Sequence, residues 1–169
     1  NVYQVLEMCR LSDFTRLTDY LAKAVENLVA AGAEIVSLTG NTPHIVFEAL
    51  QARSAVPLVS IIDATRNAAV AQGVKNVGLL GTRFTMEADF FTRPLIDNGL
   101  AVVIPSQPEI DVIAHKIHHE LEKGIINPQT RQQFIAVIER MRQEDGIEAV
   151  ILGCTELPLL FGEETLPVR

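Results

Sequence analysis

Residues 145–158 read DGIEAVILGCTELP, and residues 31–44 read AGAEIVSLTGNTPH. Aligned without gaps, the two stretches share four residues at a spacing of 114 positions: Gly32 and Gly146, Glu34 and Glu148, Val36 and Val150, and Leu38 and Leu152. A third stretch, GVKNVGLLGTRFT at residues 73–85, has the same order of glycine, apolar run and polar loop. Each stretch predicts the end of a helix at a glycine, then a short buried strand and a loop. The repetition indicates related units, although this order is also general among α/β proteins.

The rest of the sequence alternates between predicted strands and predicted helices. Strands are predicted at residues 2–7, 34–38, 57–61, 76–80, 101–105 and 148–152. Helices are predicted at residues 15–31, 44–53, 63–72, 85–99, 107–122 and 128–144, the fourth interrupted by Pro94. Strands made of Val, Ile and Leu are buried on both faces, as in parallel sheets covered by helices. The predicted fold class is therefore α/β with parallel sheets.

The composition excludes several classes of protein. Hydrophobic residues make up 48% of the 169 positions, enough for a sizeable core, so disorder is excluded. The net charge of −7 argues against nucleic acid or an anionic membrane as the main partner. Two cysteines, Cys9 and Cys154, fit a reducing cytoplasm, and no apolar run is long enough to cross a membrane. The chain starts without methionine inside an apolar run, which suggests truncation.

Polar residues follow three of the predicted strands at the end where parallel sheets bind ligands. They are Asn41 and Thr42, Thr82 and Thr85, and Thr155. Hydroxyls, an amide and free backbone N–H groups at helix starts together suit a carboxylate or a phosphate. Helix capping is the alternative, since threonine and asparagine are preferred N-caps, and Thr42 and Thr85 both have the position of a cap.

Cys154 is the candidate reactive group. A cysteine after an apolar strand is often a small buried hydrophobic residue. Here it lies beyond the strand, before Thr155 and Glu156, where the start of a helix would lower the thiol pKa and make it a base or nucleophile. A Cys–His hydrolase would also need a positioned histidine, and no signature places one. His115, His118 and His119 form a weak metal candidate on a face with Glu120 and Glu122, and no nucleotide-binding glycine pattern is present.

Three ordered motifs of the sequence resemble the aspartate/glutamate racemase family. VILGCTELPLL at 150–160 resembles the second cysteine signature, with Glu156 closer to the aspartate branch. GNTPH at 40–44 resembles the first signature, and VGLLGTRFTMEADFF at 77–91 resembles the middle block. The resemblance implies two pseudo-symmetric Rossmann-like lobes with the active site in the cleft between them. The expected first lobe is residues 1–56, completed by chain before residue 1 and from 167–169 onward, and the second is residues 57–166.

The resemblance also implies a chemistry. Such enzymes use neither pyridoxal phosphate nor a metal, so no cofactor is expected. One thiol removes the α-proton of aspartate, glutamate or a related amino acid, and a second group reprotonates the opposite face. The implied catalytic positions are Cys154 and Gly40, and the implied substrate-binding residues are Asn41, Thr42, Thr82, Thr85, Thr155 and Glu156. A homodimer in the cytoplasm is expected.

Gly40 departs from the family pattern, because the first signature usually carries cysteine, sometimes threonine, at that position. Glycine cannot act as a base, and a positioned acid or base contributes about 10²–10⁴-fold to a rate. Three residues are candidates to replace the missing base: Thr39, His44 and Cys9. Of these, Cys9 follows the first predicted strand at its carboxyl end. The alternatives are a single-thiol decarboxylase of the arylmalonate decarboxylase type, which protonates one face only, and an amino-acid-binding homologue with impaired catalysis.

Overall fold

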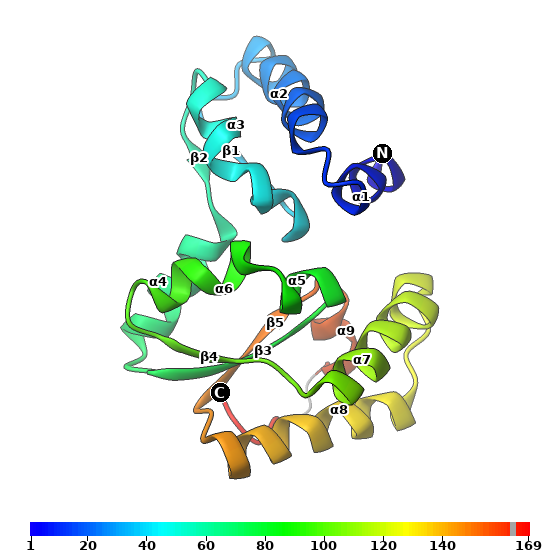
Figure 1. The fold of residues 1–169 in the computed structure, drawn as a ribbon. Coiled ribbons are helices and arrows are strands. Elements are labelled where there is room, and N and C mark those ends of the chain that lie inside the picture. Colours follow the sequence, from blue (N-terminus) through cyan, green and yellow to red (C-terminus); the bar gives the residue numbers. More distant parts are fainter. Residues whose placement is uncertain (163–164) are drawn as a thin grey trace. The chain divides into compact units, whose positions relative to one another are not determined.

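The computed structural model describes residues 1–162 and 165–169, and the chain divides into two compact units (Figure 1). The first unit comprises residues 1–64 and the second comprises residues 65–169. Both contain parallel strands accompanied by helices, so the predicted α/β class with parallel sheets is confirmed. The lobe boundary expected between residues 56 and 57 stays a prediction.

The first unit is built around a short parallel strand pair. In chain order its elements are α1 (Val2–Arg10), α2 (Phe14–Ala30), β1 (Val36–Ser37), the 3₁₀ turn η1 (Thr42–Val46), α3 (Phe47–Arg53) and β2 (Leu58–Val59). Strand β1 pairs with β2 in the register Val36 to Leu58, and both of these side chains are buried. They pack with the apolar stripe of α2 and with Leu50 of α3, which explains the helical spacing of the hydrophobic residues in 15–31.

The prediction of a strand at residues 2–7 is wrong, because these residues form helix α1. The Asn1 side chain accepts a hydrogen bond from the backbone N–H of Tyr3 at 3.1 Å and caps the helix. Met8 and Cys9 are buried with Val5 packed against them, which is helical spacing rather than strand alternation. Cys9 therefore lies on a helix and not at a strand end.

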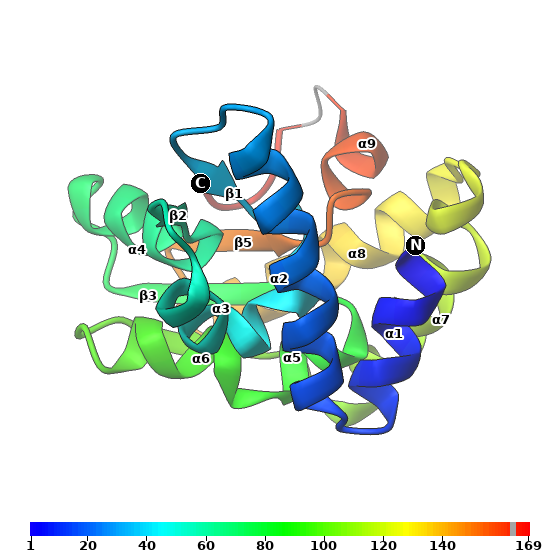
Figure 2. The same cartoon turned by 90° about the horizontal axis from the view of Figure 1, so that it is seen from above.

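The second unit contains a parallel sheet in the order β4–β3–β5. Its strands are β3 (Asn76–Gly81), β4 (Ala101–Val103) and β5 (Ala149–Gly153). Its helices are α5 (Arg83–Glu87), α6 (Asp89–Ile96), α7 (Gln107–His119), α8 (Pro128–Arg140) and α9 (Leu157–Phe161), with short turns η2 (Leu121–Lys123) and η3 (Met141–Asp145). Helix α4 (Ile61–Ala71) contains the division between the units. Figures 1 and 2 show α6 and α8 on opposite faces of this sheet, so the central strand β3 is buried.

The glycines of the repeated stretches do end helices, as predicted. Gly32, Gly73 and Gly146 have φ angles of +97°, +71° and +69°, the left-handed conformation that glycine adopts without steric cost. The predicted helix is interrupted, but not at Pro94 as predicted, because Pro94 lies inside α6. The break falls at Ala88, which is extended and separates α5 from α6. No helix among residues 1–162 and 165–169 combines the length and the apolar character that crossing a membrane requires.

Candidate active site

The second unit brings two of the predicted polar loops together at one end of its sheet. Gly81 and Gly153 are register partners at the ends of β3 and β5. Thr82 directly follows β3, and Cys154 directly follows β5. Because the strands are parallel, both loops leave the sheet at its carboxyl edge, where ligands of open α/β sheets bind.

Glycine at both strand ends allows Thr85 to pack directly against the sheet. A Cβ atom at Gly153 would lie 3.0 Å from the Leu80 carbonyl oxygen and 3.2 Å from Thr85 Cγ2. A Cβ at Gly81 would lie 3.0 Å from the Gly153 carbonyl oxygen. This role of the two glycines was not predicted, and the one signal for it in the sequence is their shared position after a strand and before a polar loop.

Thr82, and not Thr85, is the N-cap of helix α5, so the prediction of a cap at Thr85 is wrong. The hydroxyl oxygen of Thr82 accepts a hydrogen bond from the Thr85 backbone N–H at 3.3 Å. The two hydroxyl oxygens lie 3.0 Å apart and share a further hydrogen bond. Thr85 is buried while Thr82 is half-buried. A ligand at this edge would therefore meet Thr82, with Thr85 fixing the Thr82 hydroxyl from behind.

Cys154 and Glu156 form a second hydrogen-bonded pair of predicted site residues. The Cys154 Sγ donates a hydrogen bond to Glu156 Oε2 at 2.9 Å. The Thr155 hydroxyl donates to the same carboxylate oxygen at 2.8 Å. Cys154 is buried, and its neighbours in the core include Leu157 and Leu160 of α9. Thr155 is exposed and Glu156 is half-buried, so the polar side of this cluster is accessible.

The expectation of a low thiol pKa is wrong, because the backbone N–H of Glu156 at the helix start does lower the pKa of Cys154 but is outweighed. Burial raises the pKa of Cys154 to about 12, and the hydrogen bond and negative charge of Glu156 act in the same direction. Burial alone would raise the pKa of Glu156, but hydrogen bonds from Cys154 and Thr155 bring it below its ordinary value. The proton therefore stays on sulfur and the charge on the carboxylate. Glu156 is the N-cap residue of the short helix α9. The negative charge that the start of a helix favours is therefore carried by the Glu156 carboxylate and not by a thiolate.

Gly40, Asn41 and Thr42 lie in the first unit, between β1 and η1. Asn41 is the N-cap residue of η1 and Thr42 is its first residue, so the prediction of a cap at Thr42 is wrong. Gly40 does not have a left-handed backbone. A Cβ atom there would meet Pro43 Cδ at 3.5 Å, an ordinary contact. Among the residues that the structure describes, neither the backbone nor the packing therefore requires glycine at position 40.

The three candidates to replace the missing base, His44, Thr39 and Cys9, differ in burial and in hydrogen bonding. His44 is buried, and both ring nitrogens are hydrogen-bonded, Nδ1 to the Gly40 carbonyl oxygen at 2.9 Å and Nε2 to the Ile61 backbone N–H at 3.1 Å. Burial lowers the pKa of His44, and the backbone hydrogen bonds and the charge of Asp63 oppose that effect without outweighing it. Thr39 is exposed. Cys9 is buried in α1, where burial raises the pKa of its thiol.

The predicted site residues thus form two groups, one in each unit. The structure brings together Thr82, Thr85, Cys154, Thr155 and Glu156 within the second unit as loops at the ends of paired strands. It places Gly40, Asn41 and Thr42 in one turn of the first unit. A shared site in a cleft between two lobes stays a prediction.

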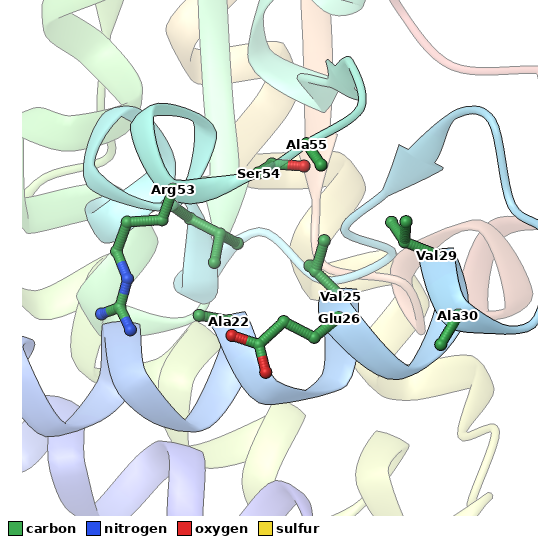
Figure 3. A pocket seen from close by; sticks show the side chains of 9 residues that line it. Ala22, Val25, Glu26, Val29, Ala30, Arg53, Ser54 and Ala55 are labelled. Atoms are coloured by element: carbon green, nitrogen blue, oxygen red, sulfur yellow. The ribbon is translucent and has the colours of Figure 1, made fainter.

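A cavity of about 250 Å³ lies elsewhere in the first unit, between α2 and α3 (Figure 3). It is lined by Ala22, Val25, Glu26, Val29, Ala30, Leu50, Arg53, Ser54 and Ala55. Its walls are mainly apolar, and Arg53 is engaged by Asp19 at 2.6 Å. None of the predicted site residues lines this cavity, so it does not mark the candidate active site.

The histidine cluster of α7 shows no metal-binding geometry. The rings of His115 and His119 have centroids 4.3 Å apart, while His118 Nδ1 lies 3.0 Å from a carboxylate oxygen of Glu122. Within the part of the chain that the structure describes, no group of three or more His, Cys, Asp or Glu side chains is arranged to hold a metal ion.

The parallel sheets and their helices place the chain among the α/β proteins, with Thr82 and Cys154 directly after the paired strands β3 and β5. The sequence profile of the Asp/Glu/Hydantoin racemases matches residues 5–168, and the chain belongs to this family. The resemblance drawn from the three motifs is therefore confirmed.

Solved structures and a curated sequence support this assignment. A candidate Asp/Glu racemase from Yersinia pestis has a TM-score of 0.90 and 31% identity, covering 100% of this chain and 74% of its own. An aspartate racemase homologue from Pyrococcus horikoshii OT3 has a TM-score of 0.83 and 41% identity, covering 90% of this chain and 66% of its own. The glutamate racemase of Corynebacterium kroppenstedtii is 29% identical over 150 residues, which are 85% of this chain and 49% of that protein. The chain thus spans about half the length of that curated racemase.

Proposed function

We propose that this protein is an amino-acid racemase that works without pyridoxal phosphate and moves the α-proton of aspartate, glutamate or a related amino acid through Cys154. The observation that carries the proposal is the Cys154–Glu156 hydrogen bond at the end of β5, in a chain of the Asp/Glu/Hydantoin racemase family. Relatives named as glutamate racemase and as an aspartate racemase homologue support the substrate class.

The protonation state of the pair indicates how Cys154 would act. With the thiol protonated and Glu156 charged, Cys154 is ready to donate its proton to a carbanion at Cα, which leaves a thiolate. In the opposite direction the thiolate must form first. The S–H proton moves to the Glu156 carboxylate, and the thiolate then takes the proton from Cα. The ammonium group of an amino-acid substrate would favour the thiolate, because a nearby positive charge lowers a thiol pKa.

The remaining predicted residues are proposed to bind the substrate. Thr155 is exposed, Thr82 is half-buried at the end of the neighbouring strand, and Thr85 holds the Thr82 hydroxyl in place. Glu156 serves Cys154 directly, and its charge would also attract a substrate ammonium group. Asn41 and Thr42 are assigned to a substrate carboxylate by their match to the family's first signature. A cytoplasmic homodimer is proposed on the same resemblance.

Gly40 favours one alternative reaction. In the described chain, the position of the family's first thiol carries no side chain, and Cys9 is on α1. A single working thiol suffices for a decarboxylase that protonates a carbanion from one side. Such an enzyme would release carbon dioxide from a substituted malonate. An amino-acid-binding homologue is the outcome if Cys154 moves no proton at all.

Solvent deuterium separates these functions. L- and D-aspartate and L- and D-glutamate are incubated with the protein in D₂O, and deuterium at Cα is followed by NMR together with chiral chromatography. Deuterium incorporation with inversion is the expected result. Deuterium incorporation with retained configuration would indicate that only one base works. Release of carbon dioxide from an arylmalonate would favour the decarboxylase. Binding measured by calorimetry without exchange would favour the binding homologue. Cys154→Ser is the control, and undiminished exchange in that variant would overturn the thiol mechanism.

A further inference from the structure

The imidazole of His44 joins two segments of the first unit that lie far apart in the sequence. Its Nδ1 is 2.9 Å from the Gly40 carbonyl oxygen, and its Nε2 is 3.1 Å from the Ile61 backbone nitrogen. A carbonyl can only accept a hydrogen bond and a backbone N–H can only donate one. The two partners therefore require a neutral ring with the proton on Nδ1 and the lone pair on Nε2.

The ring is also stacked on one face, and its neighbours in the chain are packed into the core. His44 is 4% exposed and stacks on Phe47, with ring centroids 5.3 Å apart and planes 1° from parallel. Two residues further on, Val46 packs into the apolar cluster of Met8, Cys9 and Leu17. The side chain thus has a fixed position from which it can hold other groups in place.

The two joined segments follow the two paired strands of this unit. Gly40 comes shortly after β1, which ends at Ser37, and Ile61 begins α4 shortly after β2, which ends at Val59. Since β1 and β2 are parallel, their following loops leave from the same edge. His44 bridges these loops at the edge where ligands of α/β sheets bind.

We infer that His44 is a positioning residue that fixes the Gly40–Asn41–Thr42 turn through this neutral bridge. The consequence for substrate rests on the proposed function, in which Asn41 and Thr42 contact a substrate carboxylate. His44 itself does not act as the missing base, because both ring nitrogens are engaged by the backbone. Its effect is on how well the turn is ordered before the substrate arrives, which is a contribution to binding.

Three variants separate the two hydrogen bonds from the shape of the ring. His44→Phe keeps the stacking on Phe47 and removes both hydrogen bonds. His44→Asn keeps a donor near the Nδ1 position for the Gly40 carbonyl, and His44→Gln keeps an acceptor near the Nε2 position for the Ile61 N–H. His44→Phe is expected to raise KM about 3- to 30-fold with a smaller change in kcat, as the loss of one or two hydrogen bonds predicts. His44→Asn is expected to recover part of that loss, because its amide still holds the turn that carries Asn41.

A spectroscopic measurement on the unmutated protein tests the bridge without relying on activity or on the folding of a variant. Ring ¹H–¹⁵N spectra are expected to show His44 protonated at Nδ1 and unprotonated at Nε2, and the Ile61 amide is expected to exchange slowly with solvent. A proton on Nε2, or fast exchange at Ile61, would overturn the bridge. A normal KM in folded His44→Phe would overturn the positioning role. If the unmutated protein moves no α-proton while the ring spectrum is as expected, the proposed function fails and the bridge stands.

Discussion

The Cys154 thiol donates a 2.9 Å hydrogen bond to the carboxylate of Glu156, two residues further along the chain. The acceptor is itself held by the Thr155 hydroxyl, so sulfur and carboxylate have a fixed relation to each other. A buried thiol beside a carboxylate keeps its proton, which makes the resting site a proton donor. This relation gives Glu156 a direct influence on the reactive group.

Replacing Glu156 with glutamine is expected to lower the pKa of Cys154 from about 12, while leaving it above the ordinary value of 9.0. The substitution removes the negative charge and the charged acceptor, whereas burial, the largest cause of the raised pKa, remains. The pH dependence of alkylation by iodoacetamide, read at the Cys154 peptide by mass spectrometry, measures the thiol pKa.

Glu122→Gln is the matched control for this measurement. Glu122 raises the pKa of Cys154 through its charge alone and more weakly than Glu156 does, so a smaller decrease is expected. Equal effects of the two substitutions would mean that the hydrogen bond from Cys154 to Glu156 contributes nothing specific.

Replacing Gly40 with cysteine is expected to give a folded protein with faster racemisation. The Cβ atom has space at 3.5 Å from Pro43, and the added thiol would supply a second base worth about 10²–10⁴-fold. Chiral chromatography of aspartate and glutamate after incubation checks the rate. Gly40→Ala adds the same Cβ without a thiol and is expected to leave the rate unchanged. A folded Gly40→Cys protein with no gain in rate would show that position 40 does not carry the partner base.

Replacing Gly153 with alanine is expected to destabilise the protein by about 1–3 kcal/mol, as overpacking in a core does. The new Cβ would lie 3.0 Å from the Leu80 carbonyl oxygen, which is backbone and cannot turn aside, and 3.2 Å from Thr85 Cγ2. Urea unfolding measures the change. Gly40→Ala is the comparison, and a neutral or slightly stabilising effect is expected there, because an alanine that fits restricts the unfolded chain. A neutral Gly153→Ala would mean that Thr85 does not need the close approach.

The free energy of unfolding is expected to fall as the pH is lowered below 6.5, through protonation of His44. Its pKa is lowered from 6.5 by burial in the folded protein, so the unfolded chain binds the proton first and acid favours unfolding. The contribution of neutral His44 to the free energy of unfolding is complete above pH 6.5. It is lost as the pH falls from 6.5 toward the lowered pKa of His44 in the folded protein. Asp63 acts against this effect by favouring the charged ring.

Urea unfolding at several pH values, with His44→Phe as the control, checks this dependence. Phenylalanine cannot bind a proton, so the difference in stability between the two proteins is expected to shrink as the pH falls. A difference that stays constant between neutral pH and pH 5 would contradict a neutral bridging histidine.

Much of the fold and part of the candidate site could be predicted from local sequence signals. Glycines at 32, 73 and 146 end helices because only glycine adopts the left-handed conformation freely, and continuous Val, Ile and Leu runs form strands covered on both faces. The strand-end position of Cys154 followed from the same pattern. The first helix was missed because VYQVLE fits either period, and the burial of Met8 and Cys9 against α2 and η1 decides in favour of a helix.

The sequence by itself determined the α/β class, the family and the loops that carry the polar residues, because these depend on periodicity and on short motifs. Only the tertiary structure decided which protonation state and tautomer the functional side chains have. The raised pKa of Cys154 depends on core packing and on the Glu156 carboxylate, and the neutral form of His44 depends on Gly40 and on Ile61, 17 residues away. Protonation and tautomer respond to burial and to hydrogen-bond partners, which residues acquire only when distant segments fold together.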